Sequence, residues 1–175
     1  MDWKDILDDG YSRIPGYVAH ILAGLGFQDL TWRPRPDCNS IGWLVWHLTR
    51  QQDAQVSVLM GEEQLWIKEI WHQKFNRPPD PGDTGFGDSP GDAAAFAPPE
   101  NSVVLEYLRA VVRRTIEYFR QLSEKDLDRK LDEPRFQPLP TVGIRLISIL
   151  EDCNIHAGQA AYVRGLRQGK GWQKY

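Results

Sequence analysis

Apolar residues recur every three or four positions through four long stretches of this chain. In the first stretch, for example, Ile14, Val18 and Ile21 share one side of a helix. Such a helix must bury its apolar side, and four helices can do so against one another. No stretch alternates apolar and polar residues as a strand would. The pattern predicts an all-α four-helix bundle. The helices are expected over 3–25, 40–60, 101–122 and 141–165.

The segments between these helices are less regular. Gly10, Pro15 and Gly16 weaken the first helix and predict a kink or two pieces. One or two short helices are expected between Leu65 and Phe75, and another after Ser123. The stretch Arg77–Pro99 is rich in Pro, Gly and Asp and is longer than a connection needs. Loops of this kind are usually functional or mobile, so this one is expected to form a wall or lid over a site.

Size and charge restrict the class of protein. A chain of 175 residues is expected to form one domain, residues 1–175. The net charge of −3 and the scattered Lys and Arg argue against a nucleic-acid partner. No apolar run approaches the roughly 20 residues of a membrane span, and no signal peptide is visible. Cys38 and Cys153 lie far apart in sequence, which favours a reduced, cytoplasmic protein.

Three residues on two of the helices carry ligand chemistry. Asp152 and His156 are four residues apart, so a helix places them on one face, a turn from each other. His47 lies on the second long helix, among Trp and Leu residues. Two imidazoles and one carboxylate around a point form a divalent-metal site that keeps open coordination positions. Such sites are usually catalytic.

A solvated polar stripe is the alternative explanation, because Arg145, Ser148 and Gln159 continue the spacing of Asp152 and His156. The flanking residues, Leu-Ile-Ser-Ile-Leu before and Ala-Gly-Gln-Ala-Ala after, indicate instead a largely buried helix. Burying a carboxylate or an imidazole costs several kcal/mol unless it is paired or bound to metal. The metal site is therefore the preferred interpretation.

Further polar residues adjoin these three. Gln51 and Gln159 each lie about one turn from a histidine and either orient a ligand or pack between helices. Arg50 and Arg145 either hold a substrate carboxylate or form surface ion pairs. Trp43 precedes His47 by one turn and is expected either to contact the metal ligands or to bind substrate. Gly158 is expected to let another helix approach His156, whereas His72 is expected to be exposed or on a pocket rim.

Two motifs resemble the DinB/YfiT-like superfamily of metal-binding four-helix proteins. They are Ile-Gly-Trp-Leu-Val-Trp-His-Leu, which ends at Leu48, and His-Ala-Gly-Gln-Ala, which begins at His156. Many members of that family carry three histidines, two of them in HxxxH spacing before the Gly-Gln. Here Asp152 takes the place of the first of that pair. The chain is in this respect similar to the mycothiol-dependent S-transferase and maleylpyruvate isomerase branch, where a carboxylate stands at that position.

The resemblance implies a divalent metal, zinc before nickel or iron, held by His47, Asp152 and His156. It implies an enzyme that transfers a small thiol such as mycothiol to a small electrophile. A metal hydrolase, a non-haem iron enzyme and a non-catalytic stress-response protein with a structural metal remain as alternatives. Seven Trp residues and apolar helix faces would suit a homodimer.

Overall fold

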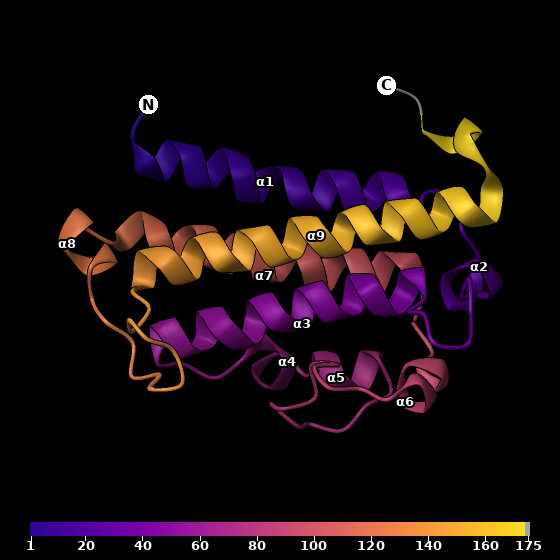
Figure 1. Ribbon diagram of the computed structural model, residues 1–175, viewed down its shortest axis with the longest axis horizontal. Helices are drawn as coiled ribbons and strands as arrows, with labels where there is room; N and C mark the ends of the chain where they lie inside the picture. The colour runs from indigo at the N-terminus through magenta and orange to yellow at the C-terminus, as the bar shows by residue number, and fades with distance from the viewer. Residues whose placement is uncertain (174–175) are drawn as a thin grey trace.

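The computed structural model describes residues 1–173, and it is all-helical as predicted. Four long helices lie along one another (Figure 1). α3 packs against α7 and α9, and α1 packs against the same two helices from the other side. α1 and α3 therefore occupy opposite corners of the bundle. The four helices are α1 (Trp3–Leu22), α3 (Ile41–Met60), α7 (Asn101–Gln121) and α9 (Val142–Gln168).

Side-chain caps fix where these helices begin. The Asp2 carboxylate accepts from the backbone N–H groups of Lys4 and Asp5 at the start of α1. Ser40 caps α3 by accepting from the N–H of Trp43, and Thr141 caps α9 in the same way. α3 ends at Gly61, whose φ of +66° is a left-handed conformation that glycine adopts without strain. The boundaries of α3 thus agree with the prediction.

α1 and α9 differ from their predicted ends. α1 is a single helix with Pro15 inside it, so the two-piece alternative is wrong, and it ends at Leu22 rather than Leu25. α9 continues to Gln168 instead of Gly165. It is closed by Gly169, whose N–H donates to the carbonyl of Gly165.

Short helices cover the ends and one side of the bundle. Three of them lie beside α3 on the side away from α1 (Figure 1). One of the three forms inside the predicted 77–99 loop, where Ser89 and Asp92 make a reciprocal capping box. The short helices are α2 (Phe27–Thr31), α4 (Leu65–Lys68), α5 (Trp71–Lys74), α6 (Pro90–Ala95), α8 (Glu124–Leu127) and a 3₁₀ turn (Lys170–Trp172).

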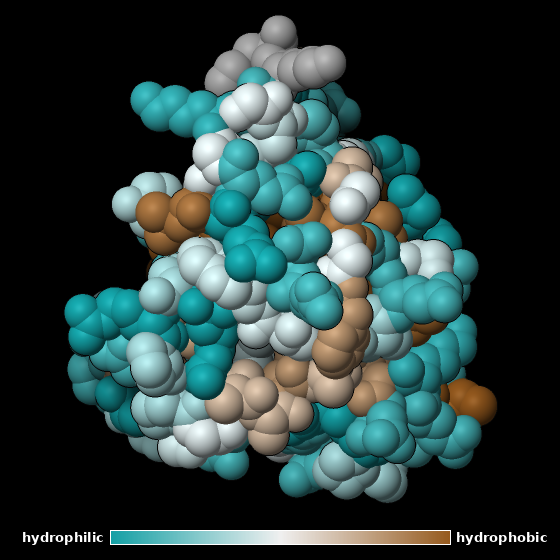
Figure 2. Space-filling view, turned by 90° about the vertical axis from the view of Figure 1, so that its right-hand side faces the viewer, coloured by the Kyte–Doolittle hydropathy of each residue, from teal (hydrophilic) through white to brown (hydrophobic). Residues whose placement is uncertain are grey.

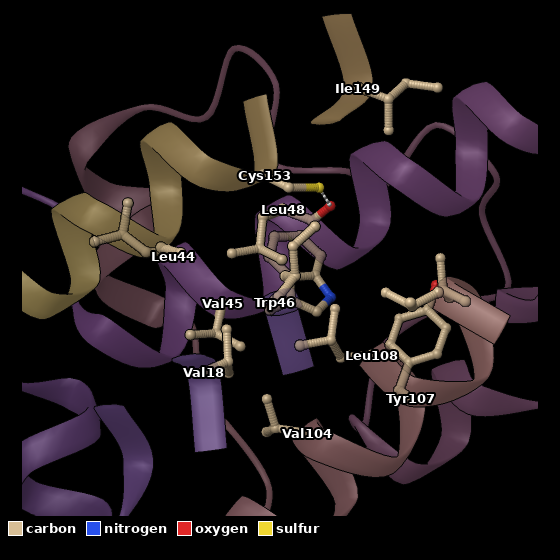
Figure 3. Packing of buried hydrophobic residues seen from close by; sticks show 14 of the residues in the cluster. Val18, Leu44, Val45, Trp46, Leu48, Val104, Tyr107, Leu108, Ile149 and Cys153 are labelled. Atoms are coloured by element: carbon tan, nitrogen blue, oxygen red, sulfur yellow. Dashed lines mark hydrogen bonds between the residues drawn. The ribbon is translucent and has the colours of Figure 1, made fainter. Parts of the chain in front are cut away.

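The core runs along the axis of the bundle and joins its two site-bearing helices. Trp46 of α3 is fully buried, with its ring centroid 6.4 Å from that of Trp66 in α4 and 4.9 Å from that of Phe96. Figure 3 shows Cys153 pointing from α9 to the carbonyl oxygen of Leu48, with Sγ 3.8 Å from that oxygen. Cys38 and Cys153 are both free thiols, as expected. These contacts set the distance between α3 and α9, which carry the predicted metal ligands.

Polar residues cover most of the outside. Seen from the end of the bundle where α2 lies, the surface is largely hydrophilic and its apolar patches are small and separate (Figure 2). Within residues 1–173, no helix combines the length and the apolar character needed to cross a membrane.

Candidate metal centre

His47 is held by a hydrogen bond and by a stacked ring. Its side chain is buried on α3, and its Nδ1 lies 2.6 Å from the carbonyl oxygen of Thr84. Because a carbonyl only accepts, Nδ1 carries the proton and Nε2 keeps its lone pair. The ring of Trp43 stacks on the imidazole with centroids 4.6 Å apart. These contacts leave Nε2 as the ligand atom of His47.

α9 brings the other two predicted ligands to the same place. His156 Nε2 lies 3.4 Å from Asp152 Oδ1, and the His47 and His156 rings meet edge to face with centroids 4.7 Å apart. One ligand atom from each of the three residues lies within 4.8 Å of the other two. In the part of the chain that the structure describes, the cluster contains these three donors. The structure thus brings together the triad expected from sequence.

The surroundings of Asp152 fit a bound cation. Its Oδ2 atom is buried and has no hydrogen-bond partner among residues 1–173. Such an atom costs free energy unless something compensates it, and a metal ion would do so. Two neutral imidazoles and a carboxylate are ordinary zinc ligands at about 2.0–2.2 Å, so the three side chains need to move only slightly to share one ion. His156 and Asp152 are half-buried rather than fully buried, because the pocket opens beside them.

The pKa values of the two histidines are shifted in opposite directions. Burial lowers the pKa of His47 below its usual value, although the hydrogen bond to Thr84 opposes this. The hydrogen bond to Asp152 raises the pKa of His156, and burial opposes that rise. Burial thus favours the neutral form of His47, whereas the hydrogen bond to Asp152 favours the protonated form of His156.

The triad lies in a cavity of about 1050 Å³ between α3, α9 and two loops. Thr84, Gly85 and Phe86 form one wall, so the 77–99 loop is a wall of the site as expected. Residues 135–138 form another wall. Gln51 and Arg145 also line the cavity. Arg145 donates to Gln55 at 2.9 Å and to Glu133, which orients it along the wall.

Trp43 and Gln159 contact the ligands directly. Trp43 stacks on His47, and its Nε1 donates to Asp88 at 2.9 Å. Gln159 Oε1 lies 2.8 Å from His156 Nδ1, so the amide oxygen accepts and Nε2 of His156 is left for the metal.

Three expectations are wrong. Arg50 does not reach the cavity, because its side chain is 0% exposed and donates to Asp83, Gln64 and other groups behind α3. Gly158 does not admit a neighbouring helix, since a Cβ there would meet no atom of residues 1–173 within 4 Å. His72 is buried, with its ring 6.4 Å from that of Trp66. Arg50 was misplaced because several of its partners, such as Asp83 and Tyr107, come from distant segments.

Sequence reasoning missed the residues that hold His47 from the loop. Thr84 contributes only a backbone carbonyl, which no side-chain pattern can show. Gly85 has a φ of +81°, and a Cβ there would lie 2.8 Å from Trp43 Cζ2 and 3.0 Å from His47 Nδ1. The Gly-Phe-Gly within the loop was the available signal for such a close approach.

Comparison with known proteins places the chain in a family. The family model of the DinB superfamily matches residues 11–160. The chain belongs to the DinB superfamily. A crystal structure described as the conserved protein of locus from Enterococcus faecalis is 30% identical and superposes with a TM-score of 0.89. That match covers 97% of this chain and 99% of the other. No curated protein matches the sequence. Metal binding is general in the DinB superfamily, and the His47–Asp152–His156 cluster is its candidate site here.

Proposed function

We propose that this DinB-superfamily protein is a zinc-dependent transferase that activates a low-molecular-weight thiol for attack on a small electrophile. The observation that carries the proposal is that three donors meet at the edge of a large cavity, and that the cluster holds no fourth His, Cys, Asp or Glu among the described residues. A metal held by fewer than four protein ligands keeps a position for substrate, whereas a structural zinc is enclosed by four. Zinc bound there would favour the thiolate form of a thiol entering the cavity.

The three residues of the triad would have different roles in such a reaction. His47 and His156 each turn Nδ1 to a protein oxygen and Nε2 to the cavity, so neither is a general base. The thiol proton therefore passes to solvent, the sulfur–carbon bond forms, and the bond to the leaving group breaks. Asp152 supplies one negative charge, which balances half of the charge of a divalent cation.

The polar residues that line the cavity favour a thiol whose carbon skeleton carries hydroxyl and amide groups. Amide and guanidinium groups of Gln51, Gln55 and Arg145 follow the triad along one side. Donors and acceptors in this arrangement suit the hydroxyl and amide groups of a sugar- or peptide-linked thiol such as mycothiol. Phe86 and Phe136 lie at the cavity and are exposed, which suits an apolar electrophile.

A thiol screen tests the proposal. The purified protein, with and without added zinc, is offered mycothiol, bacillithiol, glutathione or cysteine together with a chromogenic electrophile. We expect turnover that needs both metal and one of the thiols, and that His156→Ala abolishes. Protein that stays metal-free after zinc addition would overturn the proposal. Product formation without thiol would identify a hydrolase, and strict iron dependence with oxygen consumption would identify an oxygenase.

A further inference from the structure

Arg50 lies three residues after His47 on α3 and is buried behind it. Each of its five N–H groups has an acceptor within 3.5 Å, so the guanidinium is saturated. Its planar face also lies over the ring of Trp66, 4.5 Å from the centroid. The acceptors are the carbonyl oxygens of Pro81 and Asp83, the carboxylate of Asp53, the hydroxyl of Tyr107 and the amide oxygen of Gln64.

Two of these acceptors belong to the loop that contacts His47. Arg50 Nη2 donates to the carbonyl of Pro81 at 3.2 Å, and Nε donates to the carbonyl of Asp83 at 2.9 Å. The next carbonyl along the chain, that of Thr84, accepts from His47 Nδ1. Arg50 and His47 therefore bind consecutive carbonyl groups of one loop from one helix. The position of the Thr84 oxygen follows from the position of Arg50.

The loop is anchored a second time by its own side chains. Arg77 donates through Nε and Nη2 to the two carboxylate oxygens of Asp83, each at 2.6 Å. The guanidinium of Arg77 lies 4.7 Å from the ring centroid of Trp46, which is fully buried. The backbone of Asp83 is thus held by Arg50 and its side chain by Arg77. A loop fixed in this way presents the Thr84 carbonyl in one orientation.

That carbonyl selects the tautomer of His47. With Thr84 accepting from Nδ1, the neutral imidazole has its proton on Nδ1 and its lone pair on Nε2, facing Asp152 and His156. Without the carbonyl, an imidazole in water populates both tautomers, and a proton on Nε2 would block the ligand position. Groups that fix a ligating histidine in this way typically contribute about 10–100-fold to metal affinity.

We propose that Arg50 is a positioning residue for the metal centre. It acts through the 81–84 segment to hold His47 in the tautomer that binds metal. The inference rests on the metal centre of the proposed function and not on its thiol chemistry.

Arg114 provides a matched control in the same buried cluster. Like Arg50, it donates to the Asp53 carboxylate, at 3.3 Å, and its other acceptors are Ser57, Glu62 and the Glu63 carbonyl. None of these belongs to residues 77–88. Arg114→Lys therefore disturbs the same cluster as Arg50→Lys, while the contacts between α3 and the loop remain.

The experiment compares the two variants by two measurements. Nitrogen-15 NMR of the histidine rings in metal-free protein reports the tautomer of His47, and competition with a chromophoric chelator gives the zinc affinity. For Arg50→Lys we expect a mixture of His47 tautomers and zinc affinity lower by about 10–100-fold. For Arg114→Lys we expect the wild-type tautomer and affinity, with a lower unfolding midpoint. Equal effects of the two variants on affinity, or an unchanged tautomer in Arg50→Lys, would overturn the proposal.

A second variant serves if Arg50→Lys does not fold. Asp83→Asn removes the charge that binds Arg77 but leaves Arg50 in place, and the loop lies nearer the surface. We expect a smaller shift in the same direction, in both tautomer and zinc affinity. A wild-type protein that binds no zinc would refute the proposed function, yet the tautomer measurement on metal-free protein would still decide the role of Arg50.

Discussion

At the scale of single residues, the two histidines of the triad differ in how firmly they hold a proton. The hydrogen bond to Asp152 favours the charged form of His156, and burial disfavours the charged form of His47. In metal-free protein we expect His156 to titrate above pH 6.5 and His47 below it, the usual pKa of histidine being about 6.5. NMR titration of the ring protons would measure both. Asp152→Asn should lower the pKa of His156. An unchanged pKa would show that Asp152 does not hydrogen-bond to His156.

The proton on His156 competes with a metal ion for the same nitrogen. Zinc must displace it from His156, so affinity should fall about tenfold for each pH unit below the pKa of His156. Above that pKa, His156 is neutral and affinity should level off. His47 adds a second proton only at lower pH, because its pKa is depressed. Chelator competition across this pH range gives the curve, and a break below pH 6.5 would contradict the raised pKa of His156.

Two loop glycines allow a matched test of the contact with His47. Gly85 and Gly87 both have positive φ, +81° and +85°, but a Cβ at Gly85 would strike Trp43 and Trp46 while one at Gly87 meets nothing within 4 Å. Gly87→Ala should cost roughly 1 kcal/mol of unfolding free energy from backbone strain alone. Gly85→Ala should cost about 1–3 kcal/mol more from overpacking. Gly85→Ala should also weaken zinc binding, because the added Cβ would displace Trp43 and His47. Urea unfolding and chelator competition would compare them, and equal losses would mean that the Trp43–Gly85 contact is unimportant.

At the scale of helices, Gly158 lies inside the continuous helix α9 at a position where alanine would fit. Within the described part of the chain, a Cβ there would meet nothing within 4 Å, and the residue is exposed. Gly158→Ala should therefore raise the unfolding free energy by roughly 0.5–1 kcal/mol, because alanine loses less backbone entropy in a helix. Zinc affinity should stay unchanged, although His156 is only two residues away. A destabilised variant would indicate that something covers this face of α9.

The helices and the pairing of Asp152 with His156 were predictable because their signals are local. Asp152 and His156 share a face through helix geometry alone, and Ser40 and Gly61 mark the ends of α3. The loop was not predictable in the same way. Its contact with His47 uses a backbone carbonyl, and the partners of Arg50 come from segments as far away as Tyr107. The helix α6 did carry a local signal, since Ser89 and Asp92 have the spacing of a capping box.

At the scale of the whole molecule, the metal centre lies beside the core rather than within it. Leu48 and Cys153 pack between α3 and α9 within the core, and Tyr11 of α1 donates to the carbonyl of Leu146 in α9 at 2.6 Å. The bundle therefore has its own core without the ion. This distinguishes it from small domains that fold only when zinc binds.

Metal removal should leave the fold intact but less stable. We expect chelated protein to keep its far-ultraviolet circular dichroism, because the four helices bury their apolar faces without help from zinc. Free zinc at 100 times its dissociation constant should add about 2.7 kcal/mol to the unfolding free energy. For a chain of this length, that corresponds to a rise in Tm of about 5–10 °C. Gly158→Ala should show the full rise and Asp152→Asn little of it. Loss of the helical signal on chelation would instead make the metal structural, and would favour the non-catalytic alternative over thiol transfer.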